Sequence, residues 1–148
     1  MLSHTRRLAA ATVATGIIAG LVGLACIHLL HWIQALAWNM HSGTLLQAVS
    51  AASPARRVGV LALAGAIGAL SWFFLFRRNQ TITSVGAAVE GTPMPPLRAV
   101  WHALTQIVIV GLGASVGREV APREMAAALA AAAADRLGLC AQDRRIIV

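Results

Sequence analysis

Residues 111–124 read Gly-Leu-Gly-Ala-Ser-Val-Gly-Arg-Glu-Val-Ala-Pro-Arg-Glu, which places two acids and two arginines between strongly apolar segments. Ionisable side chains inside a membrane are costly unless they pair, contact water or bind an ion, so such a cluster is a functional-site hypothesis by default. Glycines at 111, 113 and 117 allow close backbone approach, and Pro122 suits the first turn of a helix. The stretch therefore predicts a helix that ends, a bend, and a second helix that begins near Glu119.

The start of this second helix is a predicted anion site, because the first backbone N–H groups of a helix lack partners and carry partial positive charge. An ionised Glu119 fills this site with its own carboxylate, whereas a protonated or displaced Glu119 leaves room for an external anion. A second interpretation makes Glu119 an ordinary first-turn acid that pairs with Arg123 four residues later. Local chemistry alone leaves both interpretations open.

The composition is typical of an integral membrane protein. Hydrophobic residues make up 58% of the 148 residues, charged residues only 11%, and the mean hydropathy is +0.73. The net charge of +7 comes from twelve basic residues, all of them arginine. They occur mostly as separated pairs beside apolar segments, without interleaved aromatic residues, so we expect membrane-flanking anchors and no nucleic-acid partner.

Four apolar runs, each long enough to form a helix, predict helices over about 13–39, 56–77, 97–116 and 122–137. The first run is too long for a secretory signal peptide, and its Gly16, Gly20 and Gly23 form a small-residue stripe suited to close helix packing. Residues 39–54 are expected to be a loop. Residues 79–97 contain three prolines and are either a plain loop or a short segment, around 84–89, that re-enters the membrane.

The remaining chemistry-bearing residues give no enzyme signature. No nucleophile elbow, phosphate loop or zinc pattern is present, so we expect neither enzymatic activity nor a cofactor. His28 and His31 lie three residues apart, but no convincing further ligand accompanies them, so we assign no metal. Cys26 and Cys140 are too few and too distant in sequence to predict a disulfide framework, and we expect free thiols.

A resemblance to a known family rests on two places in the sequence. Residues 117–119, Gly-Arg-Glu, precede a proline and follow a glycine-rich helix end, and they resemble the Gly-Arg-Glu-Gly-Pro motif of the ClC family of chloride channels and chloride/proton antiporters. The family's earlier Gly-Ser-Gly-Ile-Pro motif corresponds to the region around Ser84. Val120 replaces the glycine of the later motif, while Val85 and Ala87 replace a glycine and the proline of the earlier one.

The resemblance implies an all-α membrane protein: a partial ClC-like transmembrane domain over residues 1–148, truncated to the N-terminal helices and containing a broken or re-entrant segment. The likeness extends from roughly residue 13 to the end. In the family the glutamate of the later motif gates the anion path and takes part in proton coupling, so the resemblance makes Glu119 the gate. The implied anion-binding residues are Ser84, Gly117, Arg118, Val120 and Ala121.

The implied function is transmembrane chloride transport, by a voltage-gated channel or a chloride/proton antiporter. The implied partners are chloride, protons and the lipid bilayer of a bacterial inner membrane, with a homodimer as the full-length family form. One alternative is a non-transporting membrane fragment or small helical assembly protein, in which a Glu119–Arg123 pair suffices. Another is transport of a different anion such as fluoride, suggested by the altered motif around Ser84.

Overall fold

The computed structural model describes residues 2–40, 43–77, 82–117, 119–136, 138 and 141–147, and all regular structure in these ranges is helical. The helices, in chain order, are α1 (Leu2–Trp38), α2 (Leu45–Ala51), α3 (Pro54–Phe76), α4 (Val85–Val89), α5 (Pro96–Gly111), α6 (Val120–Arg136) and α7 (Ala141–Ile147).

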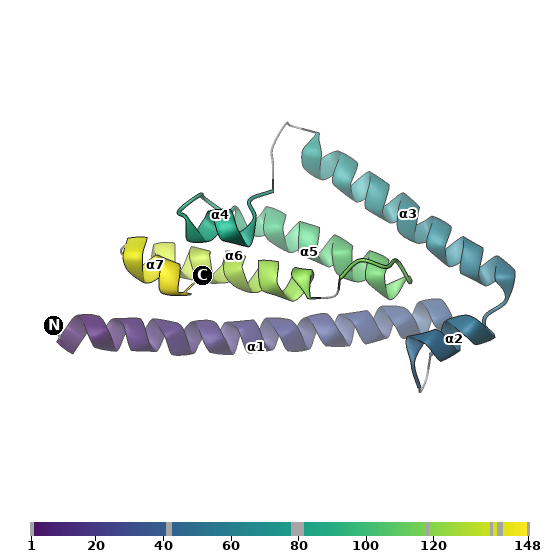
Figure 1. The fold of residues 1–148 in the computed structure, drawn as a ribbon, viewed down its shortest axis with the longest axis horizontal. Helices are drawn as coiled ribbons and strands as arrows, with labels where there is room; N and C mark the ends of the chain where they lie inside the picture. Colours follow the sequence, from purple (N-terminus) through teal and green to yellow (C-terminus); the bar gives the residue numbers. More distant parts are fainter. Residues whose placement is uncertain are drawn as a thin grey trace.

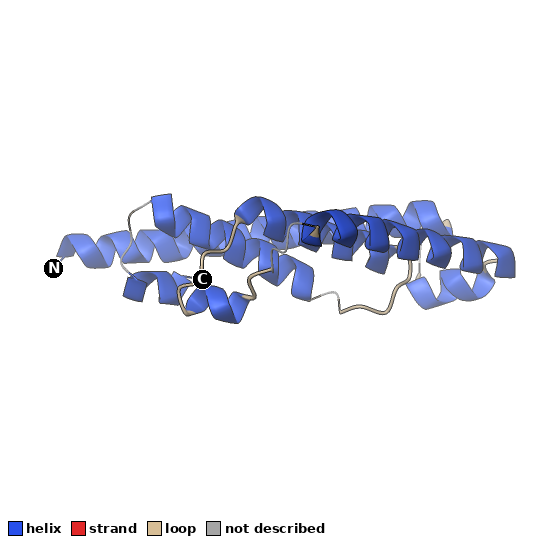
Figure 2. Ribbon diagram, turned by 90° about the horizontal axis from the view of Figure 1, so that it is seen from above, coloured by secondary structure: helices blue, strands red, loops and turns tan. Residues whose placement is uncertain are grey.

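Helix α5 lies at the centre of the arrangement, packed against α6, α3 and α1 (Figure 1). Helix α6 also runs along α1, and the short α4 and α7 both contact α6. Seen from above, the helices form a flat, elongated body (Figure 2). The largest buried cluster is built mainly from α1, α3 and α5, joined by Ala121 of α6, and includes Leu30, Ala64 and Ile107. Because α5 has neighbours on three sides, most of its second half is buried.

Two helices, α1 from Leu8 onward and α3, are long and apolar enough to cross a membrane. Only 11% of the most apolar window in each is buried within the molecule, which is unlike the core helix of a soluble protein. At 1.5 Å per residue, the 37 residues of α1 extend about 55 Å, more than the hydrocarbon thickness of a bilayer. The apolar face that these helices present is therefore suited to lipid or to another membrane chain.

Helix boundaries depart from the sequence-based expectations in three places. Helix α1 begins at Leu2 rather than near residue 13, because the basic head contains no glycine or proline to interrupt it. Helix α2 occupies part of the expected loop over 39–54, and it begins with a capping box in which Thr44 and Gln47 satisfy each other's backbone N–H groups. Helix α5 ends at Gly111 rather than near residue 116.

The early end of α5 is a Schellman motif. The Gly113 N–H donates to the Val110 carbonyl at 3.0 Å and the Ala114 N–H donates to the Ile109 carbonyl at 2.9 Å. Gly113 has φ +99°, a left-handed conformation that a residue with a side chain adopts at a cost. This glycine turns the chain away from α5 and leads it towards the start of α6.

The glycine stripe of α1 does not serve close packing within this chain. A Cβ atom added at Gly16, Gly20 or Gly23 would meet nothing within 4 Å. The close approach to α1 instead comes from Gly111, where an added Cβ would lie 2.7 Å from Cγ2 of Ile33. Small-xxx-small spacing is common and does not show which helix face meets a neighbour, and the close packing expected at this stripe is not found within the described residues.

Candidate anion site at the start of helix α6

Glu119 directly precedes α6, and its side chain is exposed. The carboxylate folds back over Gly117, since a Cβ added at Gly117 would lie 3.0 Å from Oε2 of Glu119. A residue with a side chain at position 117 would therefore push the carboxylate away. Glu119 lies at the end of α6 where the first backbone N–H groups lack helical partners and the helix dipole is positive.

Glu119 is one wall of a cavity of about 500 Å³ between α1, α5 and the start of α6. The cavity combines a mostly apolar lining with a few polar groups, a combination common to sites for small ligands. Its lining residues come from all three elements and are Gly23, Cys26, Ile27, Leu30, His31, Gln106, Ile107, Val110, Gly117, Glu119, Ala121 and Pro122.

The residues expected to bind an anion are only partly brought together. Gly117 and Ala121 line the cavity together with Glu119. Val120, the first residue of α6, lies between Glu119 and Ala121 in the sequence and is not among the lining residues. Ser84 does not line it; this residue is the N-cap of α4, where its Oγ accepts the Ala87 N–H at 3.2 Å. Arg118 lies outside the described residues.

The second interpretation of Glu119 required an ion pair with Arg123. Within the described ranges, no ion pair joins these two side chains, and Arg123 is itself exposed. The carboxylate instead turns towards Gly117 and the cavity.

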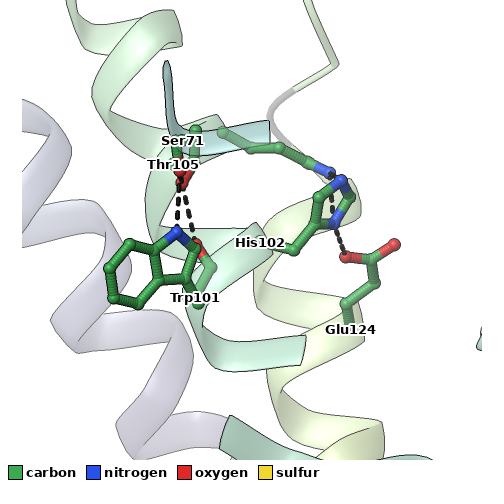
Figure 3. A network of polar contacts seen from close by, with 6 residues as sticks. Ser71, Trp101, His102, Thr105 and Glu124 are labelled. Carbon is green, nitrogen blue, oxygen red and sulfur yellow. Dashed lines mark hydrogen bonds and ion pairs between the residues drawn. The ribbon is translucent and has the colours of Figure 1, made fainter. Parts of the chain in front are cut away.

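Glu124, the second acid of the stretch, has a buried partner that sequence reasoning missed. His102 Nδ1 on α5 lies 2.7 Å from Oε2 of Glu124 on α6, and the side chains are only 14% and 12% exposed (Figure 3). Gln106, one turn after His102, brings its Nε2 atom to 3.1 Å from Nδ1 and 3.3 Å from Nε2 of the imidazole. His102 and Gln106 at i and i+4 share one helix face, which is the only sign of this network in the sequence.

A separate polar group joins α5 to α3 beside this network. The hydroxyls of Ser71 and Thr105 are 2.6 Å apart, and Trp101 Nε1 donates to Ser71 Oγ at 2.7 Å (Figure 3). The Thr105 hydroxyl also contacts the Trp101 carbonyl at 2.9 Å. These side-chain hydrogen bonds link α5 to α3.

The histidines and cysteine of α1 contribute to the site only in part. His31 lines the cavity and His28 does not. No group of three metal-binding side chains exists in the part of the chain that the structure describes. Cys26 is a free, buried thiol whose Sγ lies 3.7 Å from Sδ of Met125, whereas Cys140 lies outside the described residues.

Comparison with known proteins identifies the family. Residues 64–148, more than half of the chain, match the family model described as voltage gated chloride channel. The match begins inside α3, so it is shorter than the resemblance expected from about residue 13, but it includes Ser84 and the whole stretch that contains Glu119. No curated protein and no solved structure gives a significant match. Because the family model matches more than half of its residues, this chain belongs to the voltage-gated chloride channel family, ClC.

Proposed function

We propose that this chain supplies part of a chloride path in which Glu119 is the gate. The observation that carries the proposal is the position of the Glu119 carboxylate: it lies at the start of α6, on the wall of a cavity of about 500 Å³, with no described cation paired to it. An ionised carboxylate there occupies the positive end of α6 and opposes an entering anion. Protonation or displacement of Glu119 leaves the backbone N–H groups at the start of α6 to chloride.

In this proposal, the other residues that the family resemblance implies bind the anion next to the gate. Backbone groups of Gly117, Arg118, Val120 and Ala121 supply the positive field. The Ser84 hydroxyl accepts a backbone hydrogen bond, so its own O–H can still donate to an anion. Proton exchange at Glu119 would link chloride movement to pH, as a channel gate or as part of an antiporter.

A continuous path requires more than this cavity, so assembly is part of the proposal. The apolar faces of α1 and α3 are exposed, and they suit lipid in a bacterial inner membrane or the helices of a second copy. A second copy of this chain, assembled with the first as a homodimer, would complete the walls.

The test is anion efflux from proteoliposomes containing this chain, measured over a pH series. We expect chloride efflux to rise towards acidic pH. The Glu119→Gln variant should lose that dependence and run at or above the acidic rate of the unmodified chain, because glutamine cannot carry the blocking charge. Glu90→Gln, which neutralises an exposed acid at the end of α4, is the matched control and should retain the dependence.

Two results would contradict the proposal. One is efflux no greater than that of empty liposomes from protein whose helical circular dichroism is intact. The other is a Glu119→Gln profile identical to that of Glu90→Gln. Parallel measurement with a fluoride electrode decides the alternative anion: faster fluoride than chloride efflux, still dependent on Glu119, reassigns the substrate and keeps the gate.

A further inference from the structure

A second cavity, of about 480 Å³, lies where α1 ends, α2 follows and α3 begins (Figure 1). Its three polar side chains, Asn39, Gln47 and Arg56, come from three successive segments of the chain. The other lining residues are Trp38, Met40 and three alanines. None of these residues lines the cavity at the start of α6, so the two cavities are separate. We call the second one the hairpin cavity.

The hydrogen-bonding groups left over in the hairpin cavity are mostly donors. Oε1 of Gln47 accepts the Thr44 N–H at 3.1 Å, so the NH₂ group of this side chain remains. Arg56 donates from Nε and Nη2 to carbonyls at the end of α1, at 2.8 and 3.4 Å, and its Nη1 remains. The Asn39 side chain has no partner among the described residues. Three side chains thus offer N–H groups to a ligand rich in acceptors.

The hairpin cavity is positively charged, because it contains a guanidinium and no acid. Residues 1–89 include neither aspartate nor glutamate, and no carboxylate in the described ranges pairs with Arg56. The end of α1 carries a partial negative charge of about half a unit, but Arg56 occupies its carbonyls and brings a full positive charge. The ligand that fits is an anion with several oxygen acceptors, and phosphate is the anion that arginine binds best through such donors.

The position of the cavity selects a lipid as the source of the phosphate. The two apolar spans, Leu8–Trp38 and Pro54–Phe76, end and begin at this cavity, so it lies at the level where hydrocarbon gives way to headgroups. Trp38 contributes an aromatic wall at this level, as is typical of membrane interfaces. Leu36 and Val58, close to the ends of the spans, are both exposed, so acyl chains have apolar surface near the cavity.

We propose that the hairpin cavity binds the phosphate of an anionic phospholipid, with Arg56, Gln47 and Asn39 as donors. The lipid contacts α2, α3 and the residues after α1 together and so holds these segments at the membrane surface. A zwitterionic lipid binds more weakly, because the guanidinium repels its cationic headgroup. This site uses no residue of the proposed chloride path and requires no transport by the chain.

Lipid preference is the first measurement. The chain is taken from micelles that contain equal amounts of phosphatidylglycerol and phosphatidylcholine, and the lipid that stays bound is counted by native mass spectrometry. We expect one phosphatidylglycerol to be retained at least about fivefold more often than phosphatidylcholine, the factor that one cation near a membrane surface contributes. Equal retention of the two lipids overturns the proposal.

Gln47→Glu is the decisive variant. Glutamate serves the capping box as well as glutamine does, so α2 keeps its start, but the NH₂ donor becomes a carboxylate oxygen that repels phosphate. We expect the preference for phosphatidylglycerol to disappear. Ser50→Glu adds the same charge at an exposed position of α2 that does not line the cavity, and it should retain the preference. Equal lipid retention by the two variants places the lipid elsewhere and overturns the site.

A second pair of variants tests the cation. Arg56→Gln should lose the preference, whereas Arg77→Gln, the same change at an exposed residue at the other end of α3, should keep it. The opposite result overturns the role of Arg56. Because Arg56 also caps α1, Gln47→Glu decides the matter if Arg56→Gln does not fold. Displacement of phosphatidylglycerol by an equal concentration of inorganic phosphate overturns the lipid assignment and leaves a site for free phosphate.

Discussion

Gly111 shows how one missing side chain sets the distance between two helices. It lies at the end of α5, where an added Cβ would fall 2.7 Å from Cγ2 and 3.0 Å from Cβ of Ile33 on α1. The Gly111 carbonyl, one of the last of the helix, accepts the indole N–H of the buried Trp38 at 3.2 Å. Both contacts join α5 to α1 next to the cavity. Trp38 is thus a packing residue where α1 meets the end of α5.

Gly111→Ala is expected to destabilise the protein, because Cβ atoms of both residues would have to move apart in a packed interface. Overpacking of this kind costs about 1–3 kcal/mol. Gly65→Ala is the matched control: Gly65 lies in the middle of α3, and an added Cβ there meets nothing within 4 Å. That change should leave stability equal or raise it by up to about 1 kcal/mol through helix propensity. Thermal unfolding followed by circular dichroism in detergent measures both, and equal midpoints would contradict the prediction.

At the scale of elements, the end of α1 is capped by an arginine that the sequence analysis expected to be a membrane-flanking anchor. Arg56, at the start of α3, donates from Nε to the Ala37 carbonyl at 2.8 Å and from Nη2 to the Leu36 carbonyl at 3.4 Å. These carbonyls lie at the end of α1, where a cation is favourable to the helix dipole. Arg56 thus connects α3 to the end of α1, across the segment that contains α2.

Helix α4 is too short, at five residues, to form without help. It is held by the Ser84 cap and by a cluster in which Ala88 and Met94 pack against Ala127 and Ala128 of α6. This packing places the start of α4 near α6 without bringing Ser84 into the cavity of Glu119.

Ser84→Ala and Ser53→Ala form a matched pair, because each serine is an N-cap whose Oγ accepts a backbone N–H, at 3.2 Å in α4 and 3.4 Å in α3. Each change should cost about 1 kcal/mol of stability. We expect only Ser84→Ala to slow chloride efflux from proteoliposomes, since only Ser84 is a proposed anion ligand. Equal efflux from the two variants would remove Ser84 from the anion path and leave it as a cap.

On the scale of the whole molecule, many of the buried side chains are alanines, whereas many large apolar side chains are exposed. The buried positions of α6 are mostly alanines, and Ala103 and Ala128 are fully buried. Large exposed side chains follow α1 and α3, among them Ile17, Leu21, Leu63, Leu70 and Phe73. Helices in lipid associate through close packing of small residues, because lipid competes for the large ones. This distribution agrees with the membrane assignment given by the family.

Leu63→Arg and Leu46→Arg test that assignment. Both leucines are exposed, 52% in the middle of α3 and 76% on the short α2. If α3 spans a bilayer, arginine at 63 opposes insertion by about 2.5–3.5 kcal/mol, whereas arginine at 46 has little effect. Because α1 can anchor the chain by itself, insertion of α3 is measured with a reporter glycosylation site fused after the chain, and we expect Leu63→Arg to lower insertion of α3 far more than Leu46→Arg. Equal insertion in the two variants would show that α3 does not lie in lipid.

Much of the secondary structure could be read from the sequence because it depends on local features. Apolar runs gave the long helices, and Pro122 and the glycines indicated the bend before α6. The prediction missed α2 because the Thr44 capping box was overlooked. It extended α5 too far because Gly113 was not recognised as the residue that ends the helix. The glycine stripe of α1 misled because spacing does not reveal which helix face has a neighbour.

The sequence by itself determined the helical class, the apolar character and the match to the family over residues 64–148, since these depend on the order of residues along the chain. Only the tertiary structure decided that Glu119 shares a cavity with α1 and α5, that Ser84 lies outside it, and that Glu124 pairs with His102. Those facts depend on how α5 and α6 are rotated about their axes when they pack. That rotation is fixed by contacts between residues far apart in sequence, such as Gly111 with Ile33 and Ala88 with Ala128.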